Sequence, residues 1–209
     1  ILMMGTFPDA WAAWLGNQGH DIPDPNWKFY TDKTDVAEYE DGGPVPAPLA
    51  IPKELHDTHF MIDRTMDYID QKDGLWCVHL SLLRPHPPWV APEPYNEMYP
   101  PETLKDFVRQ PDMATEGAQH PLLEAYLNKP RVCAPLDDNK TARLKASYFG
   151  LMTEVDHNLG RLFDYLKKSG QWDNTLIVFT SDHGEQIGDH WLIGKMGYFD
   201  ASYHIPLII

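Results

Sequence analysis

Two side chains that could hold a metal ion stand next to each other late in the chain. Asp182 and His183 follow an apolar run at 176–179 and two hydroxyl residues. A short apolar run rich in β-branched residues is typical of a strand buried on both faces of a parallel sheet. Open α/β sheets bind their ligands beyond the carboxyl ends of such strands, and Gly184 allows a tight turn there. The sequence therefore predicts an active-site loop at this point.

The pairing of a carboxylate with an imidazole narrows the choice of metal. Carboxylates alone suit calcium or magnesium, whereas an added imidazole shifts the preference toward manganese, iron or zinc. The alternative is that Asp182 caps a helix and His183 is a surface histidine. The position after a predicted strand favours the metal site. Two ligands do not complete a site, so at least one further carboxylate must come from elsewhere.

Two other side chains could act on an anionic group. His86 lies in a proline-stiffened loop after a second apolar run at 75–83, where it could protonate a leaving-group oxygen or bind an anionic one. Its alternative is a turn histidine packed against Trp89. Lys195 lies in a Gly-Lys-Met-Gly segment, where glycine permits close approach of a ligand and the ammonium can bind an anion. Its alternative is a solvated loop lysine.

The remaining candidates have weaker signals. His190 follows an aspartate and could be a ligand or half of a capping pair, and Glu185 could orient His183. His79 lies inside an apolar run, which favours a satisfied core histidine. Cys133 lies in a loop without a nearby constellation of basic groups. The sequence contains no Gly-x-Ser-x-Gly elbow, P-loop or dinucleotide fingerprint, so it presents no convincing nucleophile.

The elements that must position these residues can be read from hydrophobic periodicity. The pattern predicts helices at 8–16, 52–72, 121–128 and 138–169, and strands at 75–83 and 176–179. The last helix, turn, strand and ligand loop together form half of a doubly wound unit, which indicates an α/β fold. Segments 17–52 and 90–137 are rich in proline and irregular, and we expect them to determine substrate choice.

Composition limits the classes of function. The chain has 209 residues, 43% of them hydrophobic, and a formal charge of −14. That charge argues against binding of nucleic acid or an anionic membrane, and an anionic substrate would need local cations such as Lys195, Arg84 and a metal. Cys77 and Cys133 form neither a disulfide framework nor a zinc pattern, and Cys77 reads as a buried free thiol. No apolar stretch has the length of a membrane span.

Both ends of the chain have the composition of interior segments. Residues 1–5 and 205–209 are apolar, whereas a terminus is usually polar and frayed. We therefore expect an excised piece of a longer protein. The sequence does not establish a cellular compartment, although the cytoplasm is weakly favoured.

Several segments together resemble the sulfatase branch of the alkaline phosphatase superfamily, closest to the subgroup of phosphonate monoester hydrolases and arylsulfatases. The resemblance covers roughly residues 53–209 and is carried by Ser147-Tyr148-Phe149-Gly150, Glu154-Val155-Asp156, Leu159-Gly160-Arg161, Asp173-Asn174-Thr175, Thr180-Ser181-Asp182-His183-Gly184-Glu185 and Gly188-Asp189-His190. The loops at 83–88 and 194–197 match as well.

The resemblance implies a fold and a set of roles. The fold would be an alkaline phosphatase-like α/β/α sandwich. Asp182 and His183 would bind one divalent metal, manganese or calcium. His86 would contact the sulfuryl or phosphoryl group and its leaving oxygen, and Lys195 would neutralise charge in the same region. The activity would be hydrolysis of sulfate esters, or of phosphonate or phosphate esters, with a small anionic ester as substrate and a homo-oligomeric full-length enzyme.

The family nucleophile is a Cys or Ser in a C/S-x-P-S-R motif, the Cys being oxidised to formylglycine, and this chain contains neither that motif nor the early Asp-rich metal motif. We expect residues 1–209 to be the C-terminal portion of a single catalytic domain, with a lead-in at 1–52, a core at 53–209 and an irregular excursion at 84–137. This piece should be inactive alone. The alternatives are a phosphoesterase with a Ser or Thr nucleophile, and a non-catalytic metal-binding interaction module.

Overall fold

The structure is a computed structural model that describes residues 2–4, 8–22 and 51–209. These residues form two compact units, which are treated separately below. The first unit contains the described residues before 23 together with 51–99 and 147–174, and the second contains 100–146 and 175–209. Most of the predicted irregular lead-in, residues 23–50, lies outside the described part of the chain.

The first unit is mainly helical. Its elements are β1 (Leu2–Met4), α1 (Pro8–Asn17), η2 (Lys53–Leu55), α3 (Asp57–Asp70), β2 (Val78–Leu80), η3 (Tyr95–Glu97), the greater part of α6 (Asp138–Lys168) and η6 (Trp172–Asn174). No helix among the described residues is both long and apolar enough to cross a membrane.

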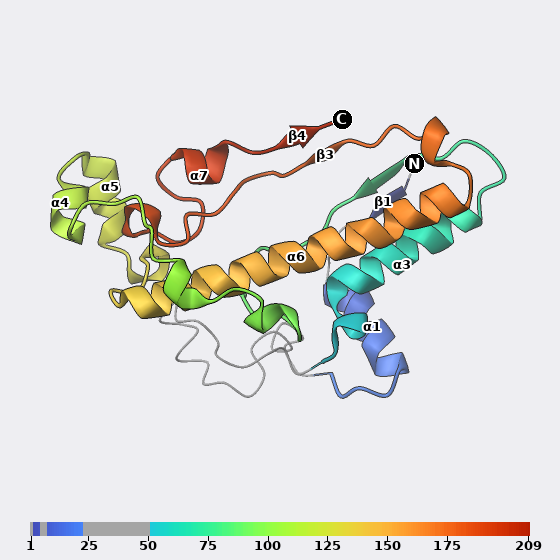
Figure 1. Ribbon diagram of the computed structural model, residues 1–209, viewed down its shortest axis with the longest axis horizontal. Coiled ribbons are helices and arrows are strands. Elements are labelled where there is room, and N and C mark those ends of the chain that lie inside the picture. Colours follow the sequence, from blue (N-terminus) through green and yellow to red (C-terminus); the bar gives the residue numbers. More distant parts are fainter. Residues whose placement is uncertain (1, 5–7, 23–50) are drawn as a thin grey trace. The chain divides into compact units, whose positions relative to one another are not determined.

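Helices α3 and α6 lie side by side and run in the same direction (Figure 1). Arg161 donates to Asp63 at 2.5 Å, and further along both helices Tyr165 donates to Asp70 at 2.6 Å. Apolar side chains of both helices are buried, notably Ile62 and Ile69 of α3 and Leu151 and Leu166 of α6. The predicted long helix is confirmed, and so is the helix predicted at 52–72, although a separate turn of 3₁₀-helix precedes it.

Helix α1 confirms the helix predicted at 8–16, and it packs against α3. The indole nitrogen of Trp11 donates to the carbonyl of Leu55 at 2.8 Å, and the rings of Trp14 and Phe60 lie 5.2 Å apart. Strand β1 pairs in parallel with β2, with the backbone of Leu2 opposite that of Val78. A strand, helices and a parallel strand in this order are the elements of an α/β fold.

The strand predicted at 75–83 is shorter and more exposed than the sequence indicated. Only Val78–Leu80 forms a paired strand, and Leu75 is fully exposed. Cys77 and His79 are exposed, so the predictions of a buried thiol and of a core histidine are wrong for this structure. An apolar run indicates that a strand would be buried if other segments covered it, but it does not show that those segments are present. Among the described strands, β2 pairs with β1 alone.

The second apolar run shows the same difference. Strand β3 (Phe179–Thr180) pairs antiparallel with β4 (Leu207–Ile208), and both are exposed. Leu176 is 80% exposed and Val178 54%, so the prediction of a strand buried on both faces of a parallel sheet is wrong within the described residues. The position of the run immediately before the ligand loop is nevertheless as predicted.

The second unit is built from short helices around a small core. Besides β3, β4 and the start of α6, its elements are η4 (Pro101–Thr103), α4 (Met113–Gly117), α5 (Pro121–Leu127), η5 (Pro130–Val132), η7 (Asp189–Trp191) and α7 (Asp200–Tyr203). Leu123, Leu127, Trp191 and Leu192 form its buried cluster. Helix α5 confirms the prediction at 121–128.

Helix α4 is an element that the sequence interpretation missed. Its signal was present, because Asp112 is an N-cap residue whose Oδ1 accepts a hydrogen bond from the Thr115 backbone at 2.7 Å. The helix has only five residues, too few for hydrophobic periodicity to show.

Two glycines of α6 provide a test of packing in the first unit. A Cβ atom at position 150 would lie 2.2 Å from the carbonyl oxygen of Tyr95, whereas one at position 160 would meet nothing within 4 Å. We therefore expect Gly150→Ala to destabilise the protein by roughly 1–3 kcal/mol and Gly160→Ala to stabilise it by about 0.5–1 kcal/mol. Urea unfolding of both variants measures the two effects, and equal shifts would contradict the close approach of α6 to η3.

Candidate active site

The loop after β3 is closed by its own side chains. The Ser181 hydroxyl donates to the carbonyl of His183 at 2.6 Å, and the His183 backbone N–H donates to Asp182 Oδ1 at 3.1 Å. The His183 side chain is only 16% exposed, whereas that of Asp182 is 88% exposed. The loop thus holds the imidazole against the protein and presents the carboxylate outward.

The ring of His183 is oriented by the next residue. Nδ1 lies 2.7 Å from the carbonyl oxygen of Gly184. A carbonyl only accepts, so Nδ1 carries the proton, and Nε2 of the neutral ring carries the lone pair that a metal needs. The sequence suggests Glu185 for this role, whereas the structure places the Gly184 carbonyl at Nδ1.

The donor atoms of the two predicted ligands lie close to each other. His183 Nε2 and Asp182 Oδ2 lie 3.7 Å apart. Two ligands that are each about 2.1 Å from one ion can lie at most about 4 Å apart, so this separation fits a shared ion. No group of three or more potential ligands gathers among the residues that the structure describes. The pair therefore fits a metal as part of a site and not as all of it.

Backbone hydrogen bonds to helix α7 hold this loop in place. The backbone N–H groups of Gly184 and Glu185 donate to the carbonyls of Ser202 and Ala201 at 2.8 and 3.0 Å. A Cβ atom at position 184 would lie 2.2 Å from the Ala201 oxygen. Only glycine permits this contact, which explains the glycine at this point of the motif.

The segment that carries Lys195 is joined to the ligand loop. The backbone N–H of Gln186 donates to Gly194 at 2.9 Å. Burial raises the pKa of Glu185 to about 7, while backbone hydrogen bonds from Gly194 and Gln186 and the charge of Lys195 oppose that rise. Lys195 itself is exposed. Asp182, His183 and Lys195 thus belong to one connected structure within the second unit.

The ring of His190 makes structural contacts within the second unit. Its Nδ1 lies 2.9 Å from Glu116 Oε1, and its ring stacks on Phe199 with 3.6 Å between ring centroids. Asp189 accepts a hydrogen bond from the backbone of Val108 at 2.9 Å. These contacts anchor the turn that follows the ligand loop. Burial raises the pKa of the Cys133 thiol, which disfavours the reactive thiolate.

His86 belongs to the first unit. It is exposed, and its Nδ1 lies 2.8 Å from the carbonyl oxygen of Pro87. The same reasoning as for His183 assigns the Nδ1 proton to this contact. Trp89 is buried, three residues further along the loop.

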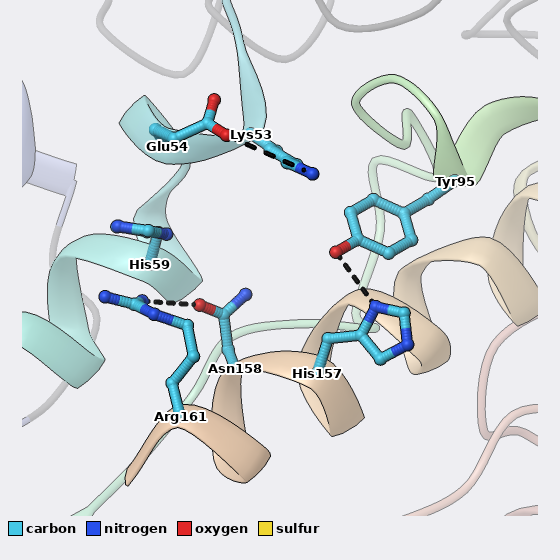
Figure 2. A pocket seen from close by; sticks show the side chains of 7 residues that line it. All are labelled: Lys53, Glu54, His59, Tyr95, His157, Asn158 and Arg161. Carbon is cyan, nitrogen blue, oxygen red and sulfur yellow. Dashed lines mark hydrogen bonds and ion pairs between the residues drawn. The ribbon is translucent and has the colours of Figure 1, made fainter. Parts of the chain in front are cut away.

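The first unit also contains a cavity of about 380 Å³. Figure 2 shows the side chains around it, from η2, α3, η3 and α6: Lys53, Glu54, His59, Tyr95, His157, Asn158 and Arg161. Tyr95 and His157 share a hydrogen bond of 3.1 Å, and Arg161 donates to Asn158 at 2.9 Å (Figure 2). No sequence motif spaces these residues, so sequence reasoning did not identify them.

The charges at this cavity balance within the unit. Lys53 lies 4.0 Å from Glu54, and Arg161 contacts Asp63 on the neighbouring helix. Burial, reinforced by Arg161, lowers the pKa of His59, while Asp63 and Glu54 oppose that shift. The cavity therefore offers hydrogen-bonding groups without a net charge that would select an anion.

The lowered pKa of His59 predicts a pH dependence of stability. Below its ordinary value of 6.5, the unfolded chain binds a proton that the folded chain resists, so the free energy of unfolding falls as the pH drops through this range. We expect His59→Gln to reduce this acid sensitivity, and the exposed His204→Gln to leave it unchanged. Urea unfolding at a series of pH values between neutral and mildly acidic provides the measurement.

Comparison with known proteins gives a consistent result. The family model for Sulfatase matches residues 10–209. The chain is 39% identical to the multifunctional alkaline phosphatase superfamily protein PehA of Trinickia caryophylli, covering 96% of this chain and 41% of PehA. It is 28% identical to an arylsulfatase of Clostridium perfringens, covering 79% of this chain and 34% of that protein.

Two solved structures share the fold over almost the whole chain. The phosphonate monoester hydrolase of Silicibacter pomeroyi is 38% identical with a TM-score of 0.81, and that of Agrobacterium radiobacter is 33% identical with a TM-score of 0.79. Each is matched over 95% of this chain and 40% of its own. The fold is thus a partial alkaline phosphatase-like α/β domain, as the sequence resemblance indicated. The chain spans about two fifths of the length of these relatives.

Proposed function

We propose a function that starts from the family of this protein: the chain belongs to the sulfatase family. The complete protein hydrolyses sulfate, phosphonate or phosphate esters in a metal-dependent reaction. The observation that carries the proposal is the pairing of Asp182 Oδ2 with His183 Nε2 at 3.7 Å, after a strand and beside the segment of Lys195. Relatives named arylsulfatase, choline-sulfatase and phosphonate monoester hydrolase support the reaction class.

We assign the metal ligands to Asp182 and His183. A divalent ion there, manganese or calcium, would supply positive charge that stabilises the non-bridging oxygens of the ester in the transition state. His183 holds its lone pair at Nε2 because Nδ1 donates to Gly184. The mixed oxygen and nitrogen donors favour manganese over calcium.

Lys195 and His86 complete the proposed roles on this chain. The Lys195 ammonium neutralises negative charge on the ester group, as a compact point charge that binds an anionic oxygen. His86 gives a proton to the departing ester oxygen through Nε2, since Nδ1 is engaged with Pro87. A formylglycine nucleophile outside this chain would attack sulfur or phosphorus.

We further propose that residues 1–209 are part of one catalytic domain and do not turn over substrate alone. The family match over 10–209 is continuous across both compact units, which supports a single domain. The C/S-x-P-S-R motif does not occur in the chain. A small anionic ester is the proposed substrate, and the complete enzyme is proposed to be a homo-oligomer.

Hydrolysis assays on the complete protein test this function. Purified protein is loaded with manganese or calcium and assayed with 4-nitrophenyl sulfate, 4-nitrophenyl phenylphosphonate and 4-nitrophenyl phosphate. We expect turnover of at least one ester that is lost on chelation and restored by the metal. Turnover that survives complete chelation would contradict metal dependence, and a metal-loaded protein inactive on all three esters would contradict the enzyme assignment.

A further inference from the structure

The loop that carries His86 has an unusual shortage of backbone donors. Prolines at 85, 87 and 88 remove the N–H groups that would satisfy neighbouring carbonyls. The His86 backbone N–H donates back to Leu83 at 2.9 Å. Carbonyl groups of such a loop need donors from elsewhere, because an unsatisfied polar group is costly when buried.

Arg84 supplies these donors from within the protein. Its side chain is 0% exposed, and Nη1 donates to the carbonyls of His86 and Pro88, both at 2.8 Å. The two carbonyls flank Pro87, whose own carbonyl orients the His86 ring. One buried guanidinium group therefore fixes the backbone on both sides of the contact that orients the imidazole.

Asp57 anchors this guanidinium group to α3. Its Oδ2 lies 3.6 Å from Arg84 Nε, and its side chain is only 5% exposed. Its Oδ1 accepts a hydrogen bond from the Thr58 backbone at 2.8 Å, at the start of the helix. The buried carboxylate of Asp57 compensates the charge of the buried Arg84 guanidinium. Because Asp57 is fixed at the start of α3, it also restricts the position of Arg84 and therefore of the loop.

We propose that Arg84 and Asp57 are positioning residues for His86, which set the direction of its Nε2. This inference rests on the proposed function, in which His86 protonates the leaving group. In that step the bond from sulfur or phosphorus to the ester oxygen breaks, its electron pair stays on that oxygen, and the oxygen takes the proton from Nε2. His86 becomes neutral and recovers a proton from water. General acids contribute most when the leaving group is a poor one.

Leaving-group dependence in the complete protein tests the proposal. We expect Arg84→Lys to lower kcat on a phenyl ester by about 10-fold or more and on the matching 4-nitrophenyl ester by less than about threefold, with KM nearly unchanged. Lysine keeps the charge but lacks the planar guanidinium fork. The exposed Arg143→Lys is the matched control and should change neither rate.

Asp57→Asn provides a second variant should Arg84→Lys fail to fold, and it should steepen the leaving-group dependence in the same direction. A folded variant of either kind with wild-type leaving-group dependence would overturn the proposal. Nitrogen-15 NMR of labelled histidine separates this result from a failure of the proposed function. This NMR measurement does not depend on esterase activity. In the wild-type protein the neutral ring of His86 should carry its proton at Nδ1, and in Arg84→Lys it should be a mixture of the Nδ1-protonated and Nε2-protonated forms. An unchanged His86 spectrum in the variant would contradict the positioning role.

Discussion

Replacing Asp182 by alanine should remove both the bound metal and the esterase activity of the complete protein. Asp182 Oδ2 lies 3.7 Å from His183 Nε2, so the two side chains are placed to share one ion. Loss of a group that only supports a metal ligand costs about 10–100-fold in metal affinity or activity, so loss of a ligand itself should cost roughly 100-fold or more. Metal content after dialysis and kcat/KM on the best ester are the two measurements.

The exposed Asp164→Ala is the control for this experiment, because it removes one carboxylate from the protein surface without touching the ligand loop. Asp182→Ala should keep the unfolding midpoint of the metal-free protein, since its side chain is 88% exposed and holds no core together. A variant that retains metal and full activity would show that the ion is held elsewhere.

The turn that places Asp182 beside His183 could be predicted from the sequence more accurately than the burial of the strands could. Asp182 and His183 are neighbours, so a single turn decides their geometry, and local residues such as Ser181 and Gly184 encode that turn. The burial of Val178 depends instead on distant segments, and the described ones do not cover it. Periodicity identified α6 correctly because its 31 residues repeat the pattern many times.

The buried polar groups of the first unit were beyond the reach of sequence reasoning. His56 and Asp57 are neighbours at the start of α3, whereas Arg84 and Glu154 come from distant segments, and each of the four has an ordinary surface or capping interpretation when taken alone. Their side chains are 0–5% exposed and lie within 3.6 Å of a partner from the same group or from Glu154. Only the packing of α3 against α6 and the 84–88 loop brings them together, and that packing depends on contacts far apart in sequence.

Replacing Glu154 by alanine should destabilise the protein by roughly 3–5 kcal/mol, the cost of removing one partner of a buried polar pair. Glu154 is 0% exposed, and its Oε1 accepts from His56 Nδ1 and Asn158 Nδ2, each at 3.1 Å. Alanine takes this acceptor from two buried donors and leaves a void between α3 and α6. Chemical denaturation of the purified protein measures the change in the free energy of unfolding.

Two further variants separate the hydrogen bonds from the general effect of a substitution in α6. Glu154→Gln keeps a carbonyl acceptor and the side-chain volume, so it should cost only about 1–2 kcal/mol. Asp156→Ala, exposed on the same helix, should change stability by less than about 0.5 kcal/mol. A cost below about 1 kcal/mol for Glu154→Ala would mean that His56 finds another acceptor easily. In that case the buried contacts from α6 through His56 to Asp57 would not support the loop of His86, and Asp57 of α3 would anchor Arg84 without help from α6.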